Sequence, residues 1–178
     1  MAQELKSSTD EEKSSAKCTE ISILCFGDSL TAGYTNFGMQ HIPYSHFLQE
    51  LIEKDYAKSI KLKIMESGVD GELVVNSMLN RISEILKKET FDIVLFLGGT
   101  NDVGHRKPTK EICTALQKIY DCIETHKSQW VAVTVPPCKF TTPSIDEERN
   151  EVNTFIRKQA SVVDLFEHVK AMNQKEKE

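Results

Sequence analysis

The sequence lacks the features that would mark a membrane, secreted or metal-binding protein. No apolar run approaches the roughly 20 residues of a membrane-spanning helix. The amino terminus is rich in Glu, Lys, Ser and Thr, without the apolar core of a signal peptide. The five cysteines form no CxxC pair and have no metal-ligand spacing with histidine. We therefore expect a reduced, cytoplasmic protein with no stable membrane anchor, no metal and no organic cofactor.

An excess of positive charge is also absent. The chain carries 22 Lys and Arg against 27 Asp and Glu, a net charge of −5. This balance argues against a general binder of phosphate backbones, so we expect no nucleic-acid partner. The 178 residues are 39% apolar, which suits one domain with a sizeable core and indicates no particular oligomeric state.

The domain itself is expected to span residues 20–169. Residues 1–19 carry too little apolar surface to offset the entropy of ordering, which predicts a flexible polar tail. Residues 170–178 are highly charged and are predicted to form a second tail.

Strand and helix patterns alternate along this domain. Apolar runs, or apolar residues alternating with lysine at an expected sheet edge, predict strands at 21–26, 60–64, 93–97, 130–135 and 162–165. Helical periodicity lies between them, and the helix beginning at Pro43 is predicted to present Phe47, Leu48, Leu51 and Ile52 on one face. The predicted fold class is α/β, a three-layer α/β/α sandwich around a five-stranded parallel sheet.

Three polar loops follow strands of this predicted sheet. They are Gly27-Asp28-Ser29, the segment 67–71 that ends in Gly71, and Gly99-Thr100-Asn101-Asp102. Such sheets bind ligands at the carboxyl ends of their strands, so the loops are expected to converge. Taken singly, each has an ordinary reading as a serine helix cap, a loop glycine or a turn-forming Asn-Asp pair.

Taken together, the loops resemble the conserved blocks of the SGNH (GDSL-type) serine hydrolases. Residues 27–34 match the first block, Gly71 stands where the family has its second-block glycine, and residues 99–102 match the third block, G-x-N-D. The resemblance covers Ile21 to about Leu165. It implies the flavodoxin-like SGNH hydrolase fold, with its parallel strands in the order 2-1-3-4-5.

The resemblance also implies a role for each residue. Ser29 would be the nucleophile, and the backbone N–H groups of Ser29 and Gly71 with the side-chain amide of Asn101 would form the oxyanion hole. Asp28 and Asp102 would brace the loops by hydrogen bonds. The implied substrate is a small-molecule carboxylic ester, by default one with a short acyl group.

The family's fourth block, D-x-x-H, has no match after the last predicted strand. The nearest segment, Asp164 to His168, is one residue too long, and the final helix is expected to be missing. His168, with Asp164 as its orienting acid, and His105 in the third loop are the remaining candidates for the general base. His105 also has the simpler reading of a solvated loop histidine.

Three hypotheses follow. In the first, the chain is a truncated serine esterase or lipase-like hydrolase whose domain is incomplete at the C-terminus, impaired here and catalytically complete only in a longer form that carries the base. Alternatively, it is a non-catalytic isoform or pseudoenzyme that keeps the fold as a binding module. The third, a flavodoxin-like phosphate or nucleotide binder, is the weakest, because neither G-x-x-x-x-G-K-[ST] nor G-x-G-x-x-G follows the first strand.

Overall fold

The computed structural model describes residues 18–56 and 59–175. Within them five parallel strands form one sheet in the order β4-β1-β5-β6-β7. The strands are β1 (Thr19–Asp28), β4 (Ile60–Val69), β5 (Ile93–Leu97), β6 (Gln129–Val133) and β7 (Val162–Val163). In chain order this is the predicted 2-1-3-4-5 arrangement, and the α/β fold is confirmed.

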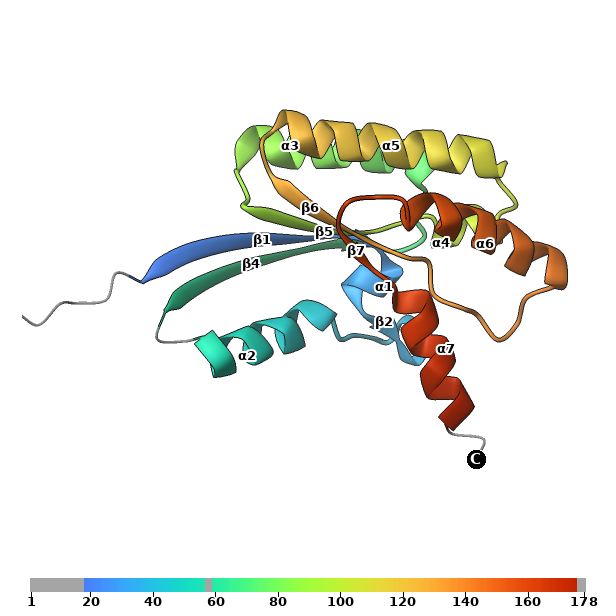
Figure 1. Cartoon of the computed structure of the whole chain (residues 1–178), viewed down its shortest axis with the longest axis horizontal. Helices are drawn as coiled ribbons and strands as arrows, with labels where there is room; N and C mark the ends of the chain where they lie inside the picture. Colours follow the sequence, from blue (N-terminus) through green and yellow to red (C-terminus); the bar gives the residue numbers. More distant parts are fainter. Residues whose placement is uncertain (1–17, 57–58, 176–178) are drawn as a thin grey trace, which may run out of the picture.

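Helices cover both faces of the sheet, which gives the three layers (Figure 1). One layer contains the π-helical turn η2 (Val74–Met78), α3 (Leu79–Lys88), α4 (Thr100–Gly104), α5 (Thr109–Thr125) and α6 (Pro143–Ile156). The other contains α1 (Ser29–Ala32), the small hairpin β2 (Tyr34–Thr35), η1 (Asn36–Gly38) and β3 (Gln40–His41), then α2 (Tyr44–Tyr56) and α7 (Leu165–Lys175). None of the helices in residues 18–56 and 59–175 is both long and apolar enough to cross a membrane.

The main core lies between the sheet and the layer of α3, α5 and α6. Phe96 of β5 and Tyr120 of α5 are fully buried there, with ring centroids 5.8 Å apart, and Tyr120 stacks on Trp130 at 4.2 Å. The helical periodicity read from the sequence supplies further members of this core: Met78, Ile82, Leu86, Ile112, Leu116, Ile119 and Ile123. The strongest apolar patterns of the chain therefore pack on this face of the sheet.

Helix α2 corrects one sequence expectation. Of the four apolar residues predicted to share its buried face, Phe47 and Leu51 are 55% and 63% exposed, whereas Leu48 and Ile52 are partly buried. The pairs 47/51 and 48/52 are offset by about 100° around the helix, and α2 contacts the edge strand β4, so only one pair can turn inward.

The carboxyl-terminal segment also differs from the prediction. The last strand ends at Val163, and α7 begins at Leu165 and continues to Lys175. A helix does follow the last strand, so the expectation of a missing final helix is wrong, and residues 170–175 of the predicted charged tail belong to α7. The reason is local, because the Asp164 carboxylate accepts a hydrogen bond from the Glu167 N–H and caps the helix. Residues 1–17 of the predicted amino-terminal tail lie outside the described residues. Thr19, the last residue of that predicted tail, belongs to β1.

Candidate active site

Ser29 is the first residue of the one-turn helix α1, directly after β1. Asp28 is the N-cap, and its Oδ1 accepts a hydrogen bond from the Leu30 N–H at 2.9 Å. Gly33 ends the turn at φ +76°, a left-handed conformation that suits glycine. The predicted strand-to-turn segment therefore becomes a short helix that holds Ser29, half-buried, at the carboxyl end of the sheet.

Gly71 lies in a tight turn at the end of the neighbouring strand. The sequence suggested a loop over residues 67–71, but β4 pairs with β1 along its whole length and continues to Val69. In this register Asp28 faces Val69, so the turn that follows β4 lies beside the turn that carries Ser29. The Glu72 N–H donates to the Val69 carbonyl at 3.2 Å, and Gly71 has φ +72° with no atom within 4 Å of the place that a Cβ would occupy.

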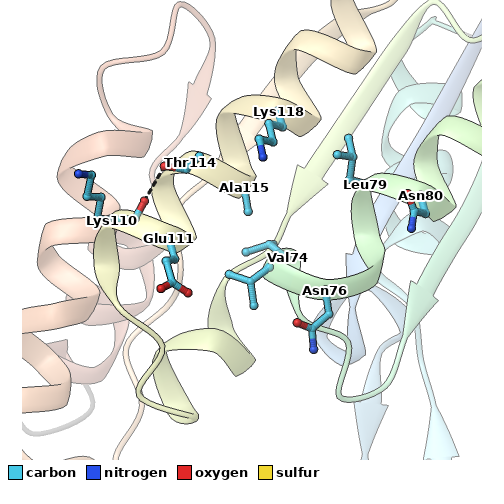
Figure 2. A pocket seen from close by; sticks show the side chains of 10 residues that line it. Val74, Asn76, Leu79, Asn80, Lys110, Glu111, Thr114, Ala115 and Lys118 are labelled. Carbon is cyan, nitrogen blue, oxygen red and sulfur yellow. Dashed lines mark hydrogen bonds between the residues drawn. The ribbon is translucent and has the colours of Figure 1, made fainter.

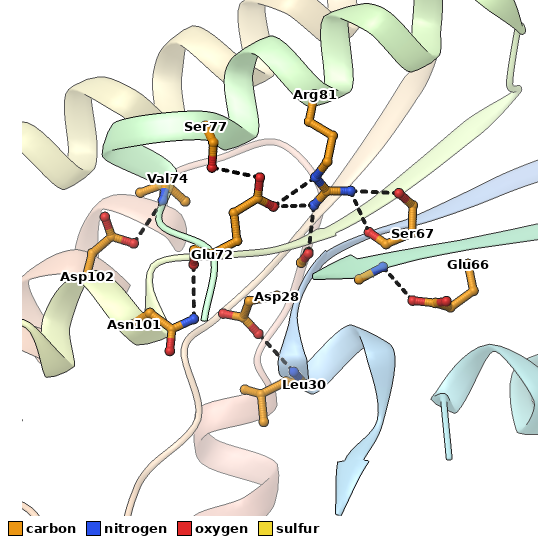
Figure 3. Close-up of polar contacts among 12 residues, drawn as sticks. Asp28, Leu30, Glu66, Ser67, Glu72, Val74, Ser77, Arg81, Asn101 and Asp102 are labelled. Atoms are coloured by element: carbon orange, nitrogen blue, oxygen red, sulfur yellow. Dashed lines mark hydrogen bonds and ion pairs between the residues drawn. The ribbon is translucent and has the colours of Figure 1, made fainter. Parts of the chain in front are cut away.

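The third loop is hydrogen-bonded to the second. The side-chain amide Nδ2 of Asn101 donates to the Glu72 carbonyl at 3.0 Å. Asp102 is fully buried, and its carboxylate accepts hydrogen bonds from the Val74 and Val75 N–H groups at 3.0 and 3.2 Å. Burial raises the pKa of Asp102, and the two N–H groups oppose that shift. Figure 3 shows Asp28, Glu72 and Asn101 close together at this edge of the sheet.

Asp28 is a buried carboxyl next to Ser29. Asp28 is 0% exposed, and its Oδ2 has no hydrogen-bond partner among the described residues. Burial raises the pKa of Asp28 to about 6, although the Leu30 N–H favours the charged form. The sequence predicted only that Asp28 braces the loop by hydrogen bonds. Its burial could be recognised only in the three-dimensional structure.

The sequence profile of the GDSL-like Lipase/Acylhydrolase family matches residues 25–177. The chain belongs to this family. The match includes all three loops described above, so the resemblance read from the sequence is confirmed at the level of the family. A comparison with curated protein sequences gives no significant match.

Several solved structures share the fold. A member of the lipolytic G-D-S-L family from Veillonella parvula superimposes with a TM-score of 0.71 at 22% identity, over 86% of this chain and 82% of that one. An acetylxylan esterase from Geobacillus stearothermophilus gives 0.67 at 17% identity, over 88% and 81%. The psychrotrophic esterase EstA from Pseudoalteromonas gives 0.63 at 19% identity, over 80% and 75%.

The histidine candidates are placed less favourably for the family's chemistry. His168 is exposed on α7, and its backbone N–H donates to the Asp164 carbonyl at 3.2 Å. The carboxylate of Asp164 is bound by Arg157, whose Nε donates at 2.8 Å, and by the Thr134 hydroxyl at 3.0 Å. Asp164 therefore orients no histidine ring in the described structure. His105 is exposed and closes α4 through its backbone N–H.

Sequence reasoning missed two polar pairs around the site. Arg81 of α3 pairs with Glu72, directly after Gly71. His41 of the small hairpin contacts Asp70, directly before Gly71, with 2.9 Å between Nε2 and Oδ2. Arg81 had no distinctive sequence signal, because α3 carries other charged residues such as Glu84 and Lys87. The pair of His41 and Asp70 had no signal, because 29 positions separate them.

A groove of about 390 Å³ lies apart from the predicted catalytic residues, between η2, α3 and α5 (Figure 2). Val74 and Ala115 are among its apolar lining residues, and Lys110 and Lys118 line it from α5. Val74 is also a residue that Asp102 anchors through its backbone N–H, so the groove borders the support of the third loop. The described residues contain no group of three or more His, Cys, Asp or Glu arranged to hold a metal ion.

Proposed function

We propose that this member of the family is a serine hydrolase that cleaves small-molecule carboxylic esters, with Ser29 as the nucleophile. The observation that carries the proposal is the meeting of three loops at the carboxyl edge of the sheet. The register of β1 and β4 brings the turns of Ser29 and Gly71 side by side, and the 3.0 Å bond from Asn101 to the Glu72 carbonyl joins the third loop to them.

In this reaction the Ser29 Oγ attacks the acyl carbon and its proton passes to a base. The carbonyl oxygen becomes an oxyanion, which the N–H groups of Ser29 and Gly71 and the amide of Asn101 stabilise. The alcohol leaves with a proton, and water then releases the acid from the acyl-serine. Asn101 has two N–H bonds on Nδ2; the Glu72 carbonyl holds one, which leaves the other for the oxyanion.

The structural neighbours support a short acyl group. Those from Geobacillus stearothermophilus and Sinorhizobium meliloti are described as an acetylxylan esterase and a carbohydrate acetylesterase family member. Their shared acyl group is acetyl, so we propose acetyl and similarly short esters as substrates.

The histidine geometry favours weak turnover, or a second candidate function. The hydrogen bond of the His41 ring goes to Asp70 and that of the His126 ring to the Cys122 carbonyl, and Asp164 is bound by Arg157. A serine without a base remains a protonated hydroxyl at neutral pH. The same observation favours a non-catalytic isoform that uses the site to bind esters without cleaving them.

The test is labelling of Ser29 by a fluorophosphonate probe. We expect the wild-type chain to be labelled and Ser29→Ala to lose all labelling while its circular dichroism spectrum is unchanged. Ser161→Ala is the matched control, because Ser161 is an exposed serine before β7, at the opposite edge of the sheet. Labelling that persists in Ser29→Ala would exclude Ser29 as the nucleophile, and an unlabelled wild-type chain would favour the binding module.

A further inference from the structure

Arg81 connects the turns that carry the predicted catalytic residues. Its guanidinium donates to the Gly27 carbonyl at 2.9 Å, and to the carbonyl and hydroxyl of Ser67 at 3.0 and 2.7 Å. Nε donates to the Glu72 carboxylate at 2.8 Å. These acceptors lie at the end of β1, near the end of β4 and in the turn after β4 (Figure 3). One side chain from α3 therefore binds the segment just before Ser29 and the segments on both sides of Gly71.

Glu72 extends this network to the third loop. Its side chain is only 7% exposed and accepts hydrogen bonds from Arg81 and from the Ser77 hydroxyl, the latter at 2.8 Å. Its backbone carbonyl accepts the Asn101 amide. Glu72, directly after Gly71, is thus held on both sides, by α3 through its side chain and by α4 through its backbone carbonyl.

Stability alone does not account for this pair. Replacing a buried ion pair by apolar residues is often neutral or stabilising, because desolvation offsets the attraction of the charges. The contacts of Arg81 are nevertheless specific. The planar fork of the guanidinium binds three segments at once, two through backbone carbonyls and one through the Glu72 carboxylate, and its carbon lies 4.0 Å from the centre of the Phe26 ring. Such a fork fixes distances between segments, as a catalytic site requires.

We propose that Arg81 and Glu72 are positioning residues that hold the Gly71 N–H and the Asn101 amide where the oxyanion forms. Neither side chain contacts the substrate. The inference rests on the proposed ester hydrolase function, because it names what aligns that reaction's donors. It predicts that loss of the fork slows acyl transfer and leaves substrate binding almost unchanged.

The experiment compares Arg81→Met, Arg81→Lys and Glu72→Gln with the wild-type chain. The rate of fluorophosphonate labelling should fall by about 10–100-fold in Arg81→Met, the usual effect of a misplaced catalytic group, with little change in the probe concentration that gives half the maximal rate. Arg81→Lys should recover part of the rate, because lysine keeps the charge but cannot serve all three segments. Arg149→Met is the matched control, a buried arginine of α6 paired within its own helix to Asp146. It should lower thermal stability and leave the labelling rate per folded molecule unchanged.

A second readout needs no activity. In the ¹⁵N-labelled protein, the side-chain amide signals of Asn101 and the backbone amide of Gly71 should shift in Arg81→Met and stay in place in Arg149→Met. An Arg81→Met protein that folds, labels at the wild-type rate and keeps these signals would overturn the inference; if it does not fold, the same result in Arg81→Lys would overturn it. A wild-type chain that is not labelled, together with shifted Asn101 signals, would contradict the proposed function and support the positioning role.

Discussion

At the scale of single residues, Asp28 combines two tasks with opposite demands. As the N-cap of α1 it offers a carboxylate oxygen to the Leu30 N–H, which favours the charged form. Its complete burial disfavours the charge, and the pKa rises to about 6. A charged Asp28 therefore makes folding less favourable at neutral pH, while the cap keeps Ser29 at the start of the helix.

This balance predicts a pH effect on stability. Because the pKa of Asp28 is about 6 in the folded protein and near 3.8 in the unfolded chain, the folded state binds the extra proton between these values. The contribution of Asp28 to the free energy of unfolding is fully present below the pKa of the unfolded chain. It falls by about 3 kcal/mol as the pH rises from there through the pKa of the folded protein. Asp28→Asn keeps the oxygen that caps the helix and removes the titration. Urea unfolding of both proteins at pH 4 and pH 7.5 should show Asp28→Asn gaining stability relative to the wild type at the higher pH; an equal difference at both would contradict a raised pKa.

Asn101 gives a second prediction at this scale. In a catalytically complete form that has its general base, removing the amide in Asn101→Ala should lower kcat by about 10²–10³-fold, the usual cost of one oxyanion-hole donor. KM should change little, because the interaction strengthens only as the oxyanion forms. The measurement is turnover of p-nitrophenyl acetate, supported by the fluorophosphonate labelling rate, with Asn80→Ala on the exposed side of α3 as the control. A raised KM with unchanged kcat would assign Asn101 to substrate binding instead.

At the scale of elements, α7 is attached to the sheet through Asp164. The carboxylate accepts hydrogen bonds from Thr134 after β6, from Arg157 after α6 and from the backbone of Glu167 in α7 itself. Arg157 lowers the pKa of Asp164, so this carboxylate stays charged and paired at neutral pH. Asp164 resembles the Asp of a D-x-x-H block that is one residue too long. In the structure, however, its carboxylate is hydrogen-bonded to Thr134, Arg157 and Glu167 and to no histidine ring.

We therefore expect Asp164 and His168 to differ in effect. Asp164→Ala should lower the free energy of unfolding by about 1–3 kcal/mol, because it removes a helix cap and leaves polar partners without an acceptor. His168→Ala removes an exposed side chain and should change it by less than about 0.5 kcal/mol. Chemical denaturation measures both. A loss of Ser29 labelling in His168→Ala with unchanged stability would instead identify His168 as the base.

At the scale of the whole molecule, the sheet and the main core are present, whereas a base for Ser29 is not evident among the described residues. We expect the 178-residue chain to fold cooperatively and to hydrolyse p-nitrophenyl acetate only slightly above the background rate. Under the proposed mechanism, the oxyanion hole alone would supply this activity, as in serine hydrolases with broken triads. Fast turnover that is lost in His105→Ala would contradict this expectation and point to a base from the third loop.

The sequence predicted the parts of the fold that depend on local pattern. Apolar runs predicted the strands at 93–97 and 130–135, and the spacing of Ile112, Leu116 and Ile119 predicted α5. These predictions work because a helix or strand that is buried on one face repeats apolar residues at its own period. Predictions failed where packing geometry chooses between similar residues. Phe47 and Leu48 of α2 have the same apolar character, and only contact with β4 decides which turns inward.

For the site, the sequence by itself determined which residue types are available and in what order. Ser29, Gly71 and Asn101 each follow a strand, and parallel strands bring such positions to one edge. Tertiary structure alone decided what holds them. Arg81 and Glu72, like Asp164 and Thr134, meet through side-chain hydrogen bonds across separate elements. The physical reason is that such bonds depend on distances of about 3 Å between groups far apart in the chain, and no local pattern records those distances.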